Sequence, residues 1–246
     1  MDSPDQDNPT TPAAPLERLE KAVCDFLTRR DAGTLDAMTT DLADKPERNR
    51  LVEILGRRLG SRYALATLAN FQAYHPKQAD VLARLAKFAE NMPSLIGSGV
   101  LLFGAPGTGK DHLLAALLKI ATAKWGYRVT WWDGVDLAAE FRSLMNENSR
   151  TTEREFIREL VRPHVLAISD PVPPRGELST YQLSTLREVI DLRYRDRKPI
   201  WITTNIDKRD DADAALSVPL MDRLKEGAVS IYCDWPSYRA KQQPTW

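Results

Sequence analysis

Gly104-Ala105-Pro106-Gly107-Thr108-Gly109-Lys110 has the residue types and spacing of a loop that binds nucleotide phosphates, a P-loop. Glycines let backbone N–H groups converge on phosphate oxygens, and the helix predicted from Lys110 onward adds partial positive charge at its N-terminus. Lys110 would reach the β- and γ-phosphates as a point charge. The alternative is a glycine turn that only links a strand to a helix. Because an apolar strand, Val100–Phe103, comes first and a helix follows, we predict an ATP site.

The position after Lys110 departs from the usual motif. A Ser or Thr normally stands there and places its hydroxyl on Mg²⁺, but this chain has Asp111. A carboxylate also binds Mg²⁺, although it brings negative charge toward the phosphates. We therefore count Asp111 as a candidate metal ligand and extend the predicted nucleotide-binding run through His112.

A second candidate metal position follows the apolar run that starts at Val165. Strands at this place in P-loop ATPases usually end in two acids, one for the metal shell and one to polarise water. Here Ser169 takes the first place and Asp170 the second. We hypothesise that hydroxyl and carboxylate have exchanged places, so that Asp111 and Ser169 share the metal and Asp170 orients water. In the rival interpretation Asp170 itself binds Mg²⁺. A third interpretation makes Asp170 a turn or cap residue.

These residues need a scaffold that brings strand ends together, and the pattern after Pro93 predicts one. Short apolar runs that favour strands alternate with helical stretches, which indicates an α/β fold with a parallel five-stranded sheet covered by helices on both faces. Ligands in such sheets bind beyond the carboxyl ends of the strands. The predicted strands are Gly99–Phe103, Arg128–Trp132, Val165–Ile168, Ile200–Thr204 and Val229–Cys233, and the predicted helices are Lys110–Ala123, Val135–Leu144, Glu153–Val161 and Thr180–Arg195.

Length and composition fit one such domain with a smaller helical region before it. The 246 residues are 43% hydrophobic, so a core is feasible. Lys plus Arg and Asp plus Glu both number 34, so attraction to nucleic acid must come from a local patch. We divide the chain into a proline-rich disordered tail at 1–15, a helical partner-binding region at 16–92 and the ATPase domain at 93–246.

The sequence indicates neither a cysteine-based zinc site or disulfide nor a membrane-spanning segment. Cys24 and Cys233 belong to no CxxC pair, which favours two buried thiols over a zinc site or a disulfide. The N-terminus lacks the order of a signal peptide, and the apolar stretch Leu113–Ala123 is too short to span a bilayer. We expect a cytoplasmic protein that does not interact with membranes.

Several further motifs occur in an order that resembles a known family, the DnaC-like loaders of replicative helicases, which are AAA+ ATPases. The related IstB-like transposition ATPases share the same core. The motifs are Leu68-Ala69-Asn70-Phe71, the helix around Gln78–Phe88, the P-loop, Thr203-Thr204-Asn205, Asp222-Arg223-Leu224 and Ser237-Tyr238-Arg239. The resemblance covers roughly residues 60–240 and implies an AAA+ fold.

The resemblance also implies roles for three polar residues. Asn205 matches the polar sensor that helps to place the attacking water; its alternative is a turn residue at a strand end. Arg223 matches the arginine finger that reaches a neighbouring subunit's γ-phosphate, which would require self-assembly; its alternative is a surface salt bridge. Arg239 matches a second arginine that senses phosphate; its alternative is an exposed arginine near the C-terminus.

By the same resemblance, we expect an ATP- and Mg²⁺-dependent loader that contacts a replicative helicase and single-stranded DNA. One alternative is an IstB-like transposition helper. Another is a nucleotide-held adaptor with weak or no hydrolysis, which Asp111 and Ser169 favour. Trp131 and Trp132 are candidate base-stacking residues, of which at least one is expected in the core. Arg193, Arg195, Arg197 and Lys198 form a basic cluster at a helix end. Its alternatives are binding to DNA phosphates and the ordinary preference for cations at a helix C-terminus.

Overall fold

The computed structural model describes residues 35–94, 97–146, 149, 151–172, 178–206 and 216–239. The predicted tail, the helix expected from Leu16 and the expectation for Cys24 lie outside the described residues. Within the described ranges, no helix is long and apolar enough to cross a membrane.

A five-stranded parallel sheet forms the centre, as the strand–helix alternation predicted. Its order is β2-β3-β4-β1-β5. The strands are β1 Val100–Phe103, β2 Val129–Asp133, β3 Val165–Ser169, β4 Ile200–Thr204 and β5 Val229–Tyr232, so each predicted run is found with its ends shifted by at most one residue. β1 and β3 are buried along their full length, which is why they read as continuous apolar runs.

Strand register fixes the edge where the chemistry-bearing loops leave the sheet. Phe103 of β1 is aligned with Thr204 of β4, and Ser169 of β3 is aligned with Thr203 of β4. The P-loop after β1, Asp170 after β3 and Asn205 after β4 therefore emerge side by side at one edge of the sheet.

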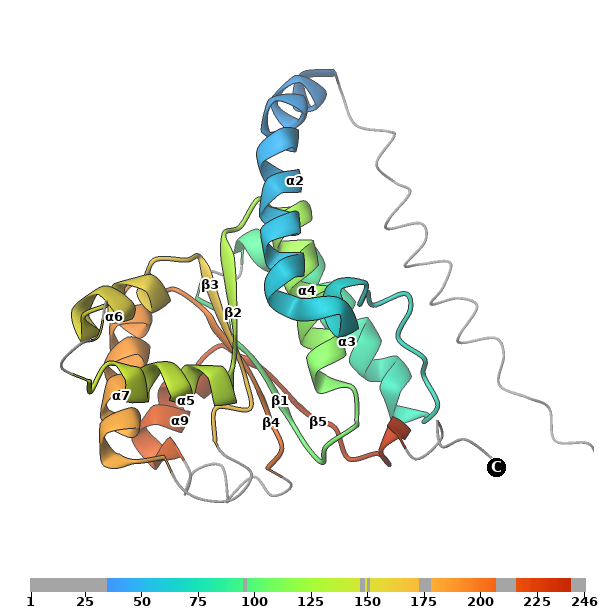
Figure 1. Cartoon of the computed structure of the whole chain (residues 1–246). Coiled ribbons are helices and arrows are strands. Elements are labelled where there is room, and N and C mark those ends of the chain that lie inside the picture. Colours follow the sequence, from blue (N-terminus) through green and yellow to red (C-terminus); the bar gives the residue numbers. More distant parts are fainter. Residues whose placement is uncertain are drawn as a thin grey trace, which may run out of the picture.

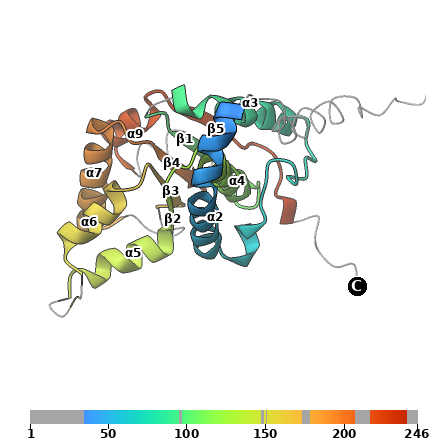
Figure 2. The same cartoon turned by 90° about the horizontal axis from the view of Figure 1, so that it is seen from above.

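Helices cover both faces of the sheet (Figures 1 and 2). One face carries α2 Leu35–Ala64, α3 Lys77–Asn91 and α4 Lys110–Ala123, while the other carries α5 Gly134–Ser143, α6 Glu153–Val161, α7 Thr180–Arg195 and α9 Val218–Lys225. Three helix starts are fixed by side-chain caps: Asp133 accepts a hydrogen bond from Val135 N–H, and Thr152 and Ser179 each form a capping box.

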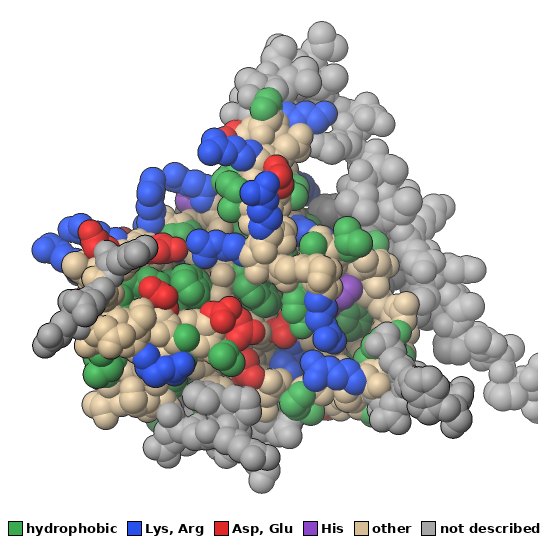
Figure 3. All heavy atoms as spheres, viewed as in Figure 1, with side chains coloured by type: hydrophobic (Ala, Val, Ile, Leu, Met, Phe, Trp, Pro, Cys, Tyr) green, Lys and Arg blue, Asp and Glu red, His purple; other side chains and the backbone are tan. Residues whose placement is uncertain are grey.

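Helix α2, Leu35–Ala64, lies within the region 16–92 that the sequence predicts to be helical. It runs through Pro46 and bends at Gly60, whose φ of 67° and ψ of 171° are not helical. Its first part projects away from the body (Figure 1), and exposed Lys and Arg side chains lie along it (Figure 3). Glycine is suited to this bend because other residues rarely adopt a positive φ.

The helices before Pro93 share a core with the sheet. Leu59 of α2 and Leu85 of α3 belong to the same buried cluster as Leu102 and Leu114. Trp131 is buried in this cluster, as expected for one of the two tryptophans. A short 3₁₀ turn, η2 Met92–Ser94, follows α3. The division into separate regions at residue 93 stays a prediction.

Cys233 is also buried, as the sequence favoured, and burial raises the pKa of its thiol to about 12.

Candidate nucleotide-binding site

The P-loop takes the form that the sequence predicted: it leaves β1 and leads directly into α4. Gly109 precedes the helix in a left-handed conformation, with φ of 90°. A Cβ at Gly109 would lie 2.6 Å from the ring of Phe71, and a Cβ at Gly107 would collide with the Ser237 hydroxyl. These two positions therefore require glycine for both conformation and space.

Lys110 is 6% exposed, and its ammonium group is held inside the loop. Nζ donates hydrogen bonds to the carbonyl oxygens of Gly104, at 2.7 Å, and Ala105, at 2.8 Å. It also donates to Asn205 Oδ1 at 3.0 Å. The lysine thus links the P-loop to the residue after β4.

Asp111 lies against the end of β3, as the exchange hypothesis requires, and also against the end of β4. Ser169 donates to Asp111 Oδ1 at 2.8 Å, and Thr203 donates to the same oxygen at 2.6 Å. The two hydroxyl oxygens are themselves 3.3 Å apart. We call Asp111, Ser169 and Thr203 the carboxylate–hydroxyl cluster. The structure therefore brings Asp111 and Ser169 together, and it adds Thr203, to which sequence reasoning gave no role.

The second oxygen of Asp111 has a partner from helix α2. The Tyr63 hydroxyl donates to Asp111 Oδ2 at 3.4 Å. Burial, followed by the negative charge of Asp111, raises the pKa of Tyr63, so its hydroxyl stays protonated and able to donate at neutral pH. The sequence pattern did not single out Tyr63, because the bend that turns it toward the P-loop is a tertiary feature.

The Asp170 carboxylate contacts Asn205, whereas the Ser169 hydroxyl contacts Asp111. Asp170 follows β3 with a positive φ of 53°, and its N–H donates to Thr203 O at 2.8 Å. Its carboxylate accepts from both Asn205 N–H, at 3.0 Å, and the Asn205 side-chain amide. Gly134 packs directly against the backbone of Asp170, where a Cβ would collide. This packing holds the left-handed residue in place.

The surroundings of Asp170 raise the pKa of its carboxyl above the ordinary value. Burial raises the pKa of this carboxyl, the two Asn205 hydrogen bonds oppose that shift, and the nearby Asp111 charge adds to it. Hydrogen bonds connect Lys110 to Asn205 and Asn205 to Asp170, and this chain lies beside the carboxylate–hydroxyl cluster.

A cavity of 350 Å³ opens beside the P-loop. Aromatic residues from segments before β1 and after β5 form part of its wall. The lining residues are Arg62, Tyr63, Asn70, Phe71, Gln72, Tyr74, Pro106, Gly107, Thr108, Gly109, Lys110, Asp111, His112, Asn205, Tyr238 and Arg239. Such a mixture of apolar rings and convergent polar groups suits a nucleotide.

His112 and Arg239, two of the predicted nucleotide-binding residues, both line this cavity but are placed differently. The His112 ring has an edge-on contact with Phe71, and Nε2 lies 2.9 Å from Thr67 O. Burial lowers the pKa of His112, which favours the neutral ring. Arg239 is exposed and follows Tyr238, whose N–H donates to Gly107 O at 2.9 Å. The C-terminal segment thus reaches back to the P-loop.

Several cavity residues had no predicted role, among them Tyr63, Gln72, Tyr74 and Tyr238. Tyr238 donates a hydrogen bond to the Gln72 amide oxygen, which joins the two segments. The aromatic spacing from Phe71 to Tyr74 and the motif at Ser237–Arg239 were visible in the sequence, but nothing local indicated that they meet at one cavity.

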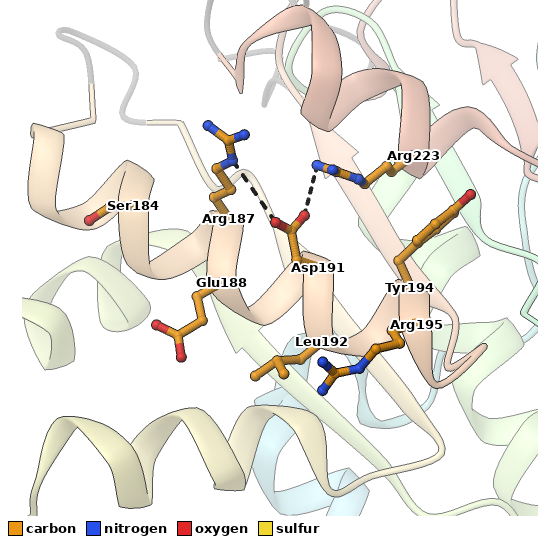
Figure 4. A pocket seen from close by; sticks show the side chains of 8 residues that line it. All are labelled: Ser184, Arg187, Glu188, Asp191, Leu192, Tyr194, Arg195 and Arg223. Carbon is orange, nitrogen blue, oxygen red and sulfur yellow. Dashed lines mark ion pairs between the residues drawn. The ribbon is translucent and has the colours of Figure 1, made fainter.

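Arg223 lies elsewhere, in a cavity of 490 Å³ formed by α7 and α9. Figure 4 shows Arg223 from α9 and Arg187 from α7 pointing at Asp191. Arg223 Nη1 is 2.8 Å from Asp191 Oδ1, and Arg187 Nε is 4.0 Å from Asp191 Oδ2. Arg223 does not line the P-loop cavity of its own chain.

The basic cluster at Arg193–Lys198 is only partly a surface feature. Arg193 is fully buried and donates to five carbonyl oxygens, those of Leu160, Val161, Pro163, His164 and Pro199. Of the two alternatives that the sequence left open for Arg193, contact with DNA phosphates is therefore wrong. This guanidinium satisfies backbone carbonyls at the end of α6 and in the loops before β3 and β4.

A model of the IstB-like ATP-binding protein family matches residues 70–245. The chain belongs to this family. The match includes the P-loop, the strand ends with the carboxylate–hydroxyl cluster, and the C-terminal segment at Arg239. It confirms the resemblance to DnaC-like and IstB-like AAA+ ATP-binding proteins.

Individual relatives cover the chain to different extents. The replicative helicase loader DnaC of Buchnera aphidicola subsp. Baizongia pistaciae is 26% identical over 194 residues, which are 78% of this chain and 77% of that protein. A protein of Sinorhizobium fredii named as an insertion sequence ATP-binding protein is 30% identical over 149 residues, 59% of this chain and 48% of that protein.

A solved structure supports the same fold assignment. A crystal structure of the DnaC helicase loader matches with a TM-score of 0.63 and 27% identity, over 70% of this chain and 99% of that chain. The five-stranded parallel sheet with helices on both faces is therefore the P-loop AAA+ fold.

Proposed function

We propose that this protein is an ATP-dependent helicase loader, which couples ATP binding and hydrolysis to contacts with a replicative helicase and single-stranded DNA. The observation that carries the proposal is the convergence of two polar arrangements at the P-loop. One is the chain Lys110–Asn205–Asp170, and the other is the carboxylate–hydroxyl cluster around Asp111. Together they supply a cation for phosphates, donors for a metal shell and a carboxylate for water.

The residues present fit ATP. Lys110 donates to carbonyl oxygens of its own loop, and phosphate oxygens would replace these acceptors with charged ones, which form stronger hydrogen bonds. Backbone N–H groups at the start of α4 face the same place. Phe71, Tyr74 and Tyr238 provide aromatic rings in the cavity wall, on which a base would stack.

The residues also fit Mg²⁺, which proteins usually hold through one or two carboxylates together with substrate phosphates. Among the described residues, no three His, Cys, Asp or Glu side chains gather as a metal cage. Asp111 offers the carboxylate, and Ser169 supplies the hydroxyl that the usual motif places after the lysine. When bound, the ion would neutralise phosphate charge that develops during transfer.

Hydrolysis needs a group that orients water at the γ-phosphate, and Asp170 is suited to this role. Asn205 holds both carboxylate oxygens, and the same amide group contacts Lys110. Displacement of Lys110 toward phosphate would break its contact with Asn205 and change how Asn205 holds Asp170. Asp170 would then accept the hydrogen bond of a water molecule and direct the oxygen of that water at phosphorus.

Arg223 would complete the site of a neighbouring copy in an assembly. It lines a different cavity from the P-loop, and its ion-pair partner, Asp191, is partly exposed. The Arg223 side chain is partly exposed, as a residue that stabilises transferring phosphate in trans needs to be.

Two functions within the family compete, and the extent of similarity favours the loader. DnaC from Buchnera matches over more than three quarters of both proteins, whereas the insertion sequence protein matches over about half of its own length. The transposition helper, which would bind duplex DNA and a transposase, is the second candidate because this chain matches the IstB-like family model.

The test measures helicase loading directly. The protein would be mixed with the replicative helicase of the same organism and with circular single-stranded DNA, and DNA-bound helicase would be counted after gel filtration. We expect ATP-dependent loading by the wild type and none by Lys110→Ala. Binding to duplex DNA and a transposase, without helicase binding, would contradict the loader function and support the transposition helper. Tight ATP binding without turnover would favour the adaptor.

A further inference from the structure

We infer that Tyr63 is a positioning residue that couples helix α2 to the metal-binding carboxylate of Asp111. The inference rests on the proposed nucleotide site and deepens it. Tyr63 lies in the last turn of α2, and its hydroxyl donates to Asp111 Oδ2 at 3.4 Å. The other carboxylate oxygen, Oδ1, accepts from Ser169 and Thr203.

The three hydroxyls around Asp111 differ in what holds them. Ser169 and Thr203 belong to β3 and β4 in the middle of the sheet, and both are buried. Their positions are set by strand pairing, which fixes one oxygen of the carboxylate. Tyr63 belongs to the segment that follows the bend at Gly60. The orientation of the second oxygen therefore depends on where that segment lies.

The segment after the bend is attached to α4 and to β2. Lys119 Nζ of α4 donates to Ala64 O at 2.9 Å, and the Tyr63 ring packs at 6.1 Å from the ring of Trp131 in β2. Within the segment, the Arg62 guanidinium lies 5.8 Å from the centre of the Tyr63 ring. The Lys119 contact joins the end of α2 to the helix that carries Asp111, so a displacement of α2 would change the surroundings of the carboxylate.

The other end of α2 is well placed to receive such a displacement. Its first part projects beyond the body (Figure 1), while Leu55 and Leu59 are packed in the core. Force applied by a partner on the projecting part would act across the core contacts and the bend at Gly60. A change of the backbone at the bend would move the Tyr63 hydroxyl, and the orientation of the Asp111 carboxylate that holds Mg²⁺ would change with it. This provides a route by which partner binding alters nucleotide affinity.

The first test replaces Tyr63 with Phe, which keeps the ring and removes only the hydroxyl. Binding of a fluorescent ADP analogue would be followed while Mg²⁺ is titrated, with a parallel titration in EDTA. Residues that hydrogen-bond to metal ligands contribute to metal affinity, and a long hydrogen bond contributes less. We therefore expect the Mg²⁺ concentration that gives half of the maximal change in analogue binding to rise by about 3- to 10-fold. Nucleotide affinity in EDTA should stay within about twofold of wild type.

Tyr127→Phe is the matched control, since Tyr127 packs against His164 away from the cavity. Its Mg²⁺ titration should equal that of the wild type. A Tyr63→Phe titration equal to the wild type would overturn the inference and leave the proposed nucleotide site intact. Failure of the wild type to bind the analogue, or binding indifferent to Mg²⁺, would overturn the proposed site and this inference together.

The second test addresses the coupling through α2 with two glycines of the same helix. Gly60→Ala places a side chain at a positive φ, whereas Gly56→Ala adds a methyl group in open space at a helical position. We expect Gly60→Ala to shift the Mg²⁺ titration in the same direction as Tyr63→Phe, and Gly56→Ala to leave it unchanged. Adding Tyr63→Phe to Gly60→Ala should then shift it little further. Equal titrations for the two glycine variants would refute the coupling.

Discussion

The Ser169 hydroxyl donates a 2.8 Å hydrogen bond to Asp111 Oδ1 across 58 positions of sequence. In the usual motif a hydroxyl follows the P-loop lysine and a carboxylate ends the third strand. Here the two groups stand in each other's places and still meet. This contact is the physical basis for treating the departures at Asp111 and Ser169 as one compensated change.

An exchange of the two side chains tests that interpretation. Asp111→Thr removes the only carboxylate of the cluster, and Ser169→Asp adds a second one beside it. We expect each single variant to weaken Mg²⁺-dependent nucleotide binding and the double variant to recover it, with a coupling free energy of about 1–3 kcal/mol. Binding would be measured by calorimetry, and thermal melting would establish that each variant is folded. Additive losses in the double variant would refute the exchange.

A substitution at Asn205 is expected to slow ATP hydrolysis while leaving nucleotide affinity nearly unchanged. The Asn205→Ala variant removes the side-chain amide that contacts both Lys110 and Asp170, so the Asp170 carboxylate is held only by the Asn205 backbone N–H. We expect kcat for ATP to fall by about 10- to 100-fold while nucleotide affinity changes by less than about threefold. Asn91→Ala, an amide on α3 outside the cavity, is the control. Unchanged turnover in Asn205→Ala would remove Asn205 from the proposed mechanism.

Arg223 is expected to act on a neighbouring copy. The Arg223→Ala variant should bind ATP normally and hydrolyse it at least about 10-fold more slowly. Lys110→Ala should be inactive because its own site cannot hold phosphate, yet it still carries Arg223. Mixing the two inactive variants should therefore give turnover above the sum of the separate activities. A mixture with only that sum would leave Arg223 as the partner of Asp191 alone.

Arg193 is expected to contribute to stability and not to DNA binding. Arg193→Ala removes a donor from five backbone carbonyls, of which those of Val161 and Pro199 keep a second donor, so we expect the free energy of unfolding to fall by about 3–5 kcal/mol. The nearby, exposed Arg195→Ala should change it by less than about 0.5 kcal/mol. Urea unfolding followed by tryptophan fluorescence measures both. A loss below about 1 kcal/mol in Arg193→Ala would contradict this account.

The sheet was predictable because its signals are local. Each strand is a short apolar run, and the P-loop joins one strand to one helix with residues that only this geometry requires. The pairing of Asp111 with Ser169 was also accessible, since Asp111 follows the P-loop at the start of α4 and Ser169 ends the strand β3, at the same edge of the sheet. The bend at Gly60 was not predictable, because its φ depends on how α2 packs against α4.

Tyr63, Tyr74 and Tyr238 reach the cavity through such tertiary packing, so no spacing in the sequence connected them. For Arg193 the sequence suggested an exposed cation, whereas the side chain is buried. Its neighbours in sequence are exposed cations, and only the ends of α6, β3 and β4 reveal that its guanidinium is surrounded by carbonyl groups.

The central claim is that the P-loop binds a nucleotide through Lys110 together with a metal held at Asp111. The most direct measurement is calorimetric titration of ATP into the wild type and Lys110→Ala, each with Mg²⁺ and with EDTA. We predict saturable binding to the wild type that weakens in EDTA and is lost in Lys110→Ala. Equal binding to both proteins, or no binding to the wild type with Mg²⁺ present, would contradict the claim.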